Sequence, residues 1–185
     1  MDHPVPQRTS TLFADIPERN TADNILRTTQ QHHVALSSMA DTKANIIITV
    51  SSIVLTLTFG RISEPELRVS VVTLGVFTLV ALLLAILAVL PKYRPLKLSG
   101  EELPTNFNLL FFGHFSELSR ERYLAEMCRV LTPDGTPYAT WAADIYSLGT
   151  YLGSHKYRYL RWSYLSFLTG FILASLEQLW RFVLN

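Results

Sequence analysis

Hydrophobic residues in this chain are gathered into long runs and are not spread evenly at helical spacing. Ile46 to Phe59 carries no charged residue, and Val69 to Leu90 carries none either. A helix needs about 20 mostly apolar residues to cross the hydrocarbon core of a bilayer. A single segment can satisfy its own backbone there only as a helix. The pattern therefore predicts two transmembrane helices, over residues 45–60 and 69–90.

A third, shorter apolar run extends from Ser163 to Leu176. It is followed by Glu177 and Arg181, which are spaced i,i+4 on a helix and can pair with each other beside Trp180 at a membrane interface. We predict a third transmembrane helix over residues 161–182. The alternative is a helix that lies flat in the interface.

The remaining segments are more polar and predict a tail and soluble helices. Residues 1–14 contain two prolines and no apolar period, which is typical of a disordered tail. No proline or glycine interrupts the chain between residues 20 and 44, so we predict a cytosolic amphipathic helix over residues 15–44 that runs directly into the first span. Residues 91–160 are predicted to form a cytosolic helical sensing or docking region, in which the aromatic stretch 107–115 is either a short strand or a helix.

Basic residues predict the orientation of these segments. The link between the first two spans carries two arginines, whereas more basic residues stand just after the second span and just before the third apolar run, at the two ends of residues 91–160. Because cytoplasmic loops are enriched in Lys and Arg, residues 91–160 and the amino terminus are predicted to be cytoplasmic. The predicted fold class is an all-α membrane protein with about three transmembrane helices and amphipathic cytosolic helices.

The polar residues of the first span fall on one face of the predicted helix. Asn45, Thr49, Ser52 and Thr56 follow one another at steps of four, three and four. One interpretation is a seam between helices, in which hydroxyls bond across the interface or back to their own carbonyls. The other is that copies of this face line a wettable path in a homo-oligomer.

Charged residues stand directly before the first apolar run. Asp41 and Lys43 lie within about one helical turn of the hydrocarbon, where an unpaired charge is costly. They form an interfacial pair or a snorkelling lysine in one interpretation, and an anion-binding site in the other. The cations that we consider as contacts of an anionic ligand are Lys43, Arg120, Arg122 and Lys156, of which the two arginines begin a predicted helix.

A long seam of large side chains predicts helix packing in the last part of the chain. Steps of three and four connect its members over about three heptads, as in helices that pack against other helices. His155 in this seam is interpreted either as a hydrogen-bonded core residue or as a ligand or pH switch. The central members of the seam are Trp141, Ile145, Leu148, Leu152 and His155, and it extends from Tyr138 to Trp162.

Composition and motifs exclude several classes of function. The chain has 185 residues, a net charge of +1 and one cysteine. It has no basic run typical of binding to a nucleic-acid polymer, and one cysteine excludes an intrachain disulfide. We find no phosphate-binding glycine loop, nucleophile elbow or metal-binding histidine pair, so we expect neither catalysis nor a metal or other cofactor.

Three segments resemble the transmembrane Pycsar effectors of bacteria, the membrane components of pyrimidine cyclic nucleotide antiphage systems. They are DTKANIIITVSSIVLTL (residues 41–57), NLLFFGHFSELSRERYLAEM (108–127) and DIYSLGTYLGSHKY (144–157). The matching positions are Asp41, Lys43, Ala44, Asn45, Phe112, Gly113, His114, Asp144, Tyr146, Leu148, Gly149, Lys156 and Tyr157. The entry to the first span and the LFFGHFS stretch carry most of the resemblance.

The resemblance implies a function at the bacterial inner membrane. A partner cyclase answers phage infection by making cyclic CMP or cyclic UMP, and the effector then impairs the inner membrane and causes abortive infection. The sequence itself leaves a second hypothesis open, a non-enzymatic membrane anchor or adaptor whose seam from Tyr138 to Trp162 docks a cytosolic partner. In either case the lipid bilayer is an expected partner. The effector hypothesis implies two further partners, other copies of the same chain in a homo-oligomer and the cyclic nucleotide.

Overall fold

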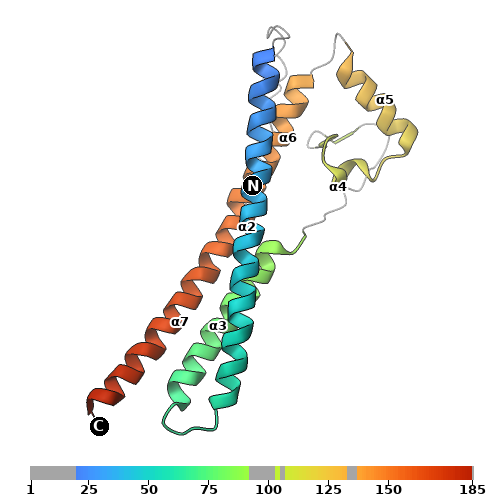
Figure 1. The fold of residues 1–185 in the computed structure, drawn as a ribbon. Coiled ribbons are helices and arrows are strands. Elements are labelled where there is room, and N and C mark those ends of the chain that lie inside the picture. Colours follow the sequence, from blue (N-terminus) through green and yellow to red (C-terminus); the bar gives the residue numbers. More distant parts are fainter. Residues whose placement is uncertain (1–19, 92–102, 105–106, 133–136, 185) are drawn as a thin grey trace. The chain divides into compact units, whose positions relative to one another are not determined.

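The computed structural model describes residues 20–91, 103–104, 107–132 and 137–184. Within these ranges every regular element is a helix and no strand occurs, as the predicted all-α fold class requires. Figure 1 labels the elements along the chain. They are α2 (Asn20–Arg61), α3 (Arg68–Val89), α4 (Phe112–Phe115), α5 (Arg120–Leu131), α6 (Pro137–Tyr151), the π-helical η1 (Leu152–Lys156) and α7 (Tyr157–Leu184).

The chain divides into two compact units, which we name the membrane unit and the polar unit. The membrane unit comprises residues 34–91 and 151–185, and the polar unit comprises residues 1–33 and 92–150. Three helical stretches of the described residues are long and apolar enough to cross a membrane. They are Thr21–Arg61, Arg68–Val89 and Pro137–Leu184.

The ends of α2 and α3 follow from local chemistry. No proline or glycine lies between Asn20 and Phe59, so nothing interrupts the 42 residues of α2. Gly60 and then Pro65 come at its end, where a turn leads to α3. The cap of α3, Leu90, is extended with ψ at 122° because it precedes Pro91, whose ring disfavours the helical conformation of the residue before it.

A single wider helical turn, which contains one extra residue, lies between α6 and α7. The N–H of Tyr157 donates to the carbonyl of Leu152, five residues back, which defines the π-helical turn η1. Such an insertion moves every later side chain by one position around the helix. In the membrane unit the buried residues after Leu152 are Lys156, Leu160 and Ser163, each one residue later than the corresponding position of the predicted seam.

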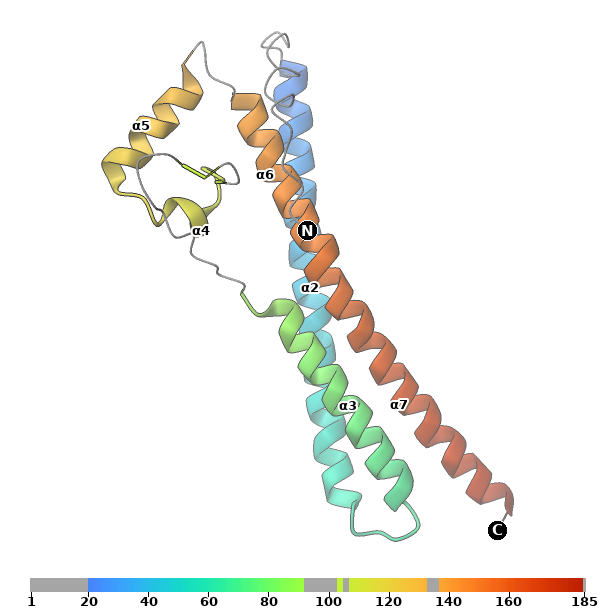
Figure 2. The same cartoon turned by 180° about the vertical axis from the view of Figure 1, so that it is seen from behind.

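Small residues form the core of the membrane unit. Small side chains let helix backbones approach closely in a membrane, where van der Waals packing replaces the hydrophobic effect between helices. Ser163 donates to the carbonyl of Ala81 at 2.6 Å, and Gly170 lies against Phe77, so α3 and α7 pack side by side (Figure 1 and Figure 2). The small buried residues are Ala40, Ala44, Ser51, Thr58, Ser70, Thr78, Ala81, Ala85, Ala88, Ser163, Gly170 and Ala174.

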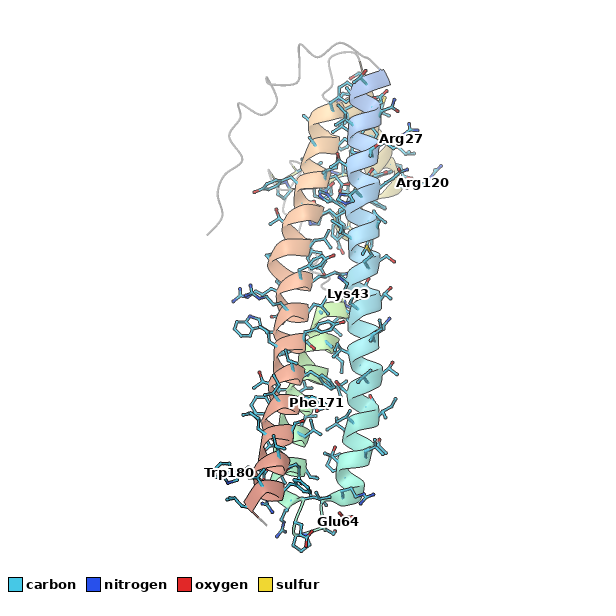
Figure 3. All side chains as sticks on the ribbon, turned by 60° about the vertical axis from the view of Figure 1, so that its left-hand side comes forward. Arg27, Lys43, Glu64, Arg120, Phe171 and Trp180 are labelled. Carbon is cyan, nitrogen blue, oxygen red and sulfur yellow. The ribbon has the colours of Figure 1, made fainter. Side chains whose placement is uncertain are left out.

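Large apolar side chains of the membrane unit point outward. Phe171, for example, is 56% exposed, and Leu83 is 54% exposed. This arrangement reverses that of a soluble protein and is suited to a surface in contact with lipid chains. Figure 3 shows Phe171 on α7 between the labelled positions Lys43 and Trp180.

A polar network connects the helices at the end of the membrane unit that holds the α2–α3 turn. Glu177 accepts a hydrogen bond from Ser70 at 2.7 Å and pairs with Arg181 at 3.0 Å. Arg181 also donates to the carbonyl of Glu66 at 2.7 Å. The i,i+4 pair expected from the sequence is therefore present, and it ties α7 to the start of α3. Glu64 and Trp180 lie at this end in Figure 3.

Several predicted features fall outside the described residues. They are the tail at residues 1–14, the start of the first helix before residue 20, the linker before residue 103 and the turn at residues 133–136. The aromatic stretch contains the short helix α4 and no strand. Ser119 caps α5, with its side chain accepting from the N–H of Arg122 at 3.3 Å.

Candidate functional site

A partly buried ion pair lies where α2 passes from its charged segment into its apolar segment. Lys156 Nζ donates to the two carboxylate oxygens of Asp41 at 2.7 and 2.8 Å and to Ser37 Oγ at 2.9 Å. All three donor positions of the ammonium group are thereby used. We call Ser37, Asp41 and Lys156 the entry site.

The π-helical turn places Lys156 in this position. Without the inserted residue, His155 and not Lys156 would follow Leu152 on the inward stripe. In the structure His155 instead makes ring contacts with Tyr151 and Tyr159, at 5.7 Å from each. Single π-helical turns are rare and occur frequently at functional sites, so this turn marks the entry site as more than ordinary helix packing.

The two charges of the pair differ in their exposure. The Lys156 side chain is 11% exposed, whereas that of Asp41 is 41% exposed. A buried ammonium group is stabilised only while its partner carboxylate is present, because water cannot reach it in sufficient number. Asp41 can be hydrated without its partner. The pair therefore holds α2 against η1, the π-helical turn that leads into α7, and this contact depends above all on Asp41.

Two tyrosines of α7 make further contacts with the backbone of α2. The Tyr157 hydroxyl donates to the carbonyl of Leu36 at 3.2 Å, and the Tyr164 hydroxyl donates to that of Lys43 at 3.4 Å. Between them lies a shallow groove with a volume of about 360 Å³, lined by Lys43, Tyr157, Leu160, Arg161 and Tyr164. We call this feature the groove.

The polar face of the first span points away from the core of the membrane unit. Asn45, Thr49, Ser52 and Thr56 are all exposed, and we call these four residues the hydroxyl face. The three hydroxyls donate to carbonyls four residues back, at 2.8 to 2.9 Å. The side-chain amide of Asn45 forms no hydrogen bond with any described residue. Within the described ranges, no helix covers this face.

A polar cluster connects α2 with α6 inside the polar unit. Asp144 accepts from Gln30 at 2.9 Å and from Asn108 at 2.8 Å, and Trp141 Nε1 donates to Gln30 at 2.9 Å. Gly149 gives the ring of His33 room on α6, since a Cβ there would lie 3.2 Å from His33 Cε1. This cluster fixes the first part of α2 by directional bonds.

His114 on α4 completes this arrangement of the polar unit. Burial lowers the pKa of His114 from its ordinary value of 6.5, because desolvation disfavours the charged imidazole. Its Nδ1 accepts the N–H of Asn108 at 2.9 Å, which also requires the neutral ring. Phe107 and Phe111 lie against the imidazole at 5.5 and 5.2 Å. Neutral His114 therefore holds Asn108 where it meets Asp144.

The predicted site residues are distributed over both units. Lys43 and Lys156 belong to the membrane unit, while Arg120 and Arg122 begin α5 in the polar unit. Asp41 pairs with Lys156 and not with Lys43, which is exposed. Within the predicted packing seam, Ile145 and Leu152 are buried, and Trp141, Leu148 and His155 are half-buried.

Sequence reasoning treated Asp41 and Lys156 separately and did not find Ser37, Gln30 or the π-helical turn. A signal for the pair was available, because both charges stand a few residues before apolar runs that must begin at the same membrane surface. Among the described residues, no group of three or more His, Cys, Asp or Glu side chains could hold a metal ion.

The fold and the entry site define a helical membrane protein with three candidate spans and an ion pair just before the apolar part of α2. Comparison with protein families matches residues 24–179 to the Pycsar effector protein domain. The match covers well over half of the chain, which therefore belongs to the Pycsar effector family. This membership implies an antiphage effector linked to a cyclic nucleotide signal. Neither the curated proteins nor the solved structures gave a match.

Proposed function

We propose that this protein is a non-enzymatic effector that impairs the bacterial inner membrane when a partner cyclase makes cyclic CMP or cyclic UMP. The impairment stops growth of the infected cell before phage mature. The amino terminus and the segment 91–160 face the cytoplasm, in keeping with the basic residues at the two ends of this segment. The observation that carries the proposal is the exposed hydroxyl face of the first span.

This face is poorly suited to permanent contact with lipid chains. Its hydroxyl hydrogens bond to the helix's own carbonyls, but the Asn45 amide has no such partner among the described residues. Asn45 stands two residues after Lys43, at the boundary of the hydrocarbon, where an amide that enters the apolar layer without a partner costs up to roughly several kcal/mol. Association of the faces of several copies removes this cost and gathers polar groups along a common axis, where water can enter. The proposed active form is therefore a homo-oligomer in which first spans face one another.

The entry site supplies a way to regulate this association. It connects α2 to η1, the turn that leads into α7, with three hydrogen bonds from Lys156. α2 also contributes Gln30 to the polar cluster, so rearrangement of the polar unit acts on the same helix that carries the hydroxyl face. For a nearly complete switch, the nucleotide must bind the active arrangement more tightly than the resting one by about 5.5 kcal/mol.

The cations proposed to contact the nucleotide phosphate fall into two separate sets, one within each unit. Arg120 and Arg122 lie at the start of α5, where free N–H groups and the helix dipole favour an anion. Lys156 lies in the membrane unit, where it becomes available to a phosphate only when it leaves Asp41. The ligand class is a cyclic pyrimidine nucleotide.

The experiment uses cells that produce the cyclase and the full-length effector. A variant with Thr49→Val, Ser52→Ala and Thr56→Val removes the hydroxyls with little change in shape. The matched control carries Thr169→Val and Ser175→Ala, which remove exposed hydroxyls from α7. Membrane potential is recorded with a voltage-sensitive dye after phage infection, at equal effector abundance.

We expect the control to depolarise the membrane as the natural chain does, and the hydroxyl-face variant to retain at least most of the potential. Equal depolarisation by both variants would contradict the role of the hydroxyl face. Unchanged potential with the natural chain, together with intact protection that is lost on Ile145→Asp, would instead favour an adaptor that docks a cytosolic partner through the seam.

A further inference from the structure

We propose that the groove binds the phosphodiester headgroup of an anionic phospholipid. The groove has one wall from α2 and one from α7, both within the membrane unit. It is shallow and open, as a site for a lipid must be if the acyl chains are to remain outside. The inference does not depend on the proposed function, since it concerns the protein in its resting membrane.

Two cations of the groove are available to an anion. Lys43 and Arg161 are both exposed, and neither forms an ion pair with a carboxylate of the described residues. No carboxylate lines the groove. The nearest acidic residue along α2 is Asp41, whose two oxygens are taken by Lys156. The groove therefore carries uncompensated positive charge.

The other lining residues suit the boundary between headgroups and acyl chains. Leu160 forms an apolar floor with 4% exposure, and Tyr157 and Tyr164 flank it with their rings. Their hydroxyls already donate to backbone carbonyls, so they offer little further donor capacity for a ribose or a base. Tyrosine is enriched at membrane interfaces because its ring is apolar and its hydroxyl is polar.

The position of the groove along the helices places it at the phosphate layer of a bilayer. Lys43 is the last charged residue before the uncharged run of the first span, and Figure 3 shows it far from the turn that holds Glu64. Arg161 precedes the third apolar run in the same way. Basic pockets between membrane helices are known binding sites for anionic headgroups. The positive charge of the groove, its shallow shape and its position at the phosphate layer all favour the headgroup of an anionic phospholipid.

The test is native mass spectrometry of the purified full chain from a zwitterionic detergent. Phosphatidylglycerol or phosphatidylcholine is added, and the fraction of chains that carry one lipid is measured against lipid concentration. We expect phosphatidylglycerol to bind and phosphatidylcholine to bind much less. A cation at a membrane surface contributes about 1 kcal/mol, or about fivefold in affinity, so Lys43→Gln with Arg161→Gln should weaken binding about 25-fold.

A matched control removes two other exposed cations, by Arg68→Gln and Arg158→Gln, and should bind phosphatidylglycerol nearly as the natural chain does. If the first variant does not fold, a variant with Lys43→Arg and Arg161→Lys, which keeps both positive charges, should retain the lipid. Equal binding of both lipids, or equal loss in both double variants, would overturn the proposal. Displacement of the lipid by cyclic CMP, with direct binding of cyclic CMP that is lost in the Lys43–Arg161 variant, would overturn it in favour of a nucleotide site.

Discussion

The unequal exposure of the entry-site charges predicts that the two partners respond differently to substitution. Asp41→Asn removes the negative charge but leaves the ammonium group of Lys156 buried. Lys156→Met removes the buried charge, keeps most of the packing of the side-chain stem, and leaves a carboxylate that water reaches. Asp41→Asn should therefore be the more damaging change, although Asp41 is the more exposed partner.

The magnitudes follow from the exposed fractions. Lys156 is 11% exposed, so leaving its charge unpaired should cost about 3–5 kcal/mol. Asp41 is 41% exposed and can be hydrated, and Lys156→Met also removes the cost of burying the ammonium group, which offsets most of the three hydrogen bonds that are lost, so this variant should cost only about 1 kcal/mol. The double variant contains no charge at either position and should be closer to the natural chain than Asp41→Asn alone.

Thermal unfolding of the detergent-purified chain measures these differences. For a chain of this size, 1 kcal/mol corresponds to roughly 2–4 °C in Tm. A loss of 3 kcal/mol in Asp41→Asn therefore lowers Tm by about 6–12 °C, whereas Lys156→Met lowers it by about 2–4 °C. The two single variants and the double variant form a complete mutant cycle, which isolates the coupling between the charges.

Two results would refute this reasoning. If Lys156→Met destabilised the chain as much as Asp41→Asn, an unpaired buried ammonium group would not be the source of the penalty. If the double variant were as unstable as Asp41→Asn alone, the loss would come from Asp41 itself and not from the charge that it neutralises.

Two further predictions concern packing and pH. Gly170→Val should lower the free energy of unfolding by about 2 kcal/mol, because the new side chain would collide with Phe77. Gly75→Ala in α3 places its methyl group in open space and should be neutral or slightly stabilising. Thermal melts of both variants check this prediction, and equal effects would contradict it. The pKa of His114 is lowered in the folded chain, so its contribution to stability is present above pH 6.5 and is lost as the pH falls below that value. Melting temperatures of the natural chain and of His114→Gln, measured between pH 5 and 8, should therefore converge at the acidic end. A difference that stays constant with pH would contradict this prediction.

The length of the apolar runs without charged residues was sufficient to predict the candidate membrane-spanning helices. The runs that begin at Ile46 and Val69 lie in α2 and α3, because lipid leaves a single segment no other way to satisfy its backbone. The step pattern of Asn45, Thr49 and Ser52 also predicted a shared face. It did not distinguish a face that packs inward from one that points outward, since that depends on which residues the neighbouring helices cover.

The entry site was harder to predict for a physical reason. Helical spacing is counted at 3.6 residues per turn, and one π-helical turn shifts the count by a residue. Gly153 lies within this turn, but a single glycine does not specify a π-helical turn. The predicted seam therefore contained His155, whereas the buried position belongs to Lys156. The polar cluster was missed because Gln30, Asn108 and Asp144 are far apart in the sequence and meet only through tertiary structure.

Release of an entrapped fluorophore from liposomes tests the central claim most directly. The purified full chain is reconstituted, and cyclic CMP, cyclic UMP or cyclic AMP is added on the side of the segment 91–160. We predict release with a cyclic pyrimidine nucleotide, loss of release in the Thr49→Val, Ser52→Ala, Thr56→Val variant, and unchanged release in the Thr169→Val, Ser175→Ala control. No release with any nucleotide, or equal release in both variants, would contradict a nucleotide-gated effector that acts through the hydroxyl face of its first span.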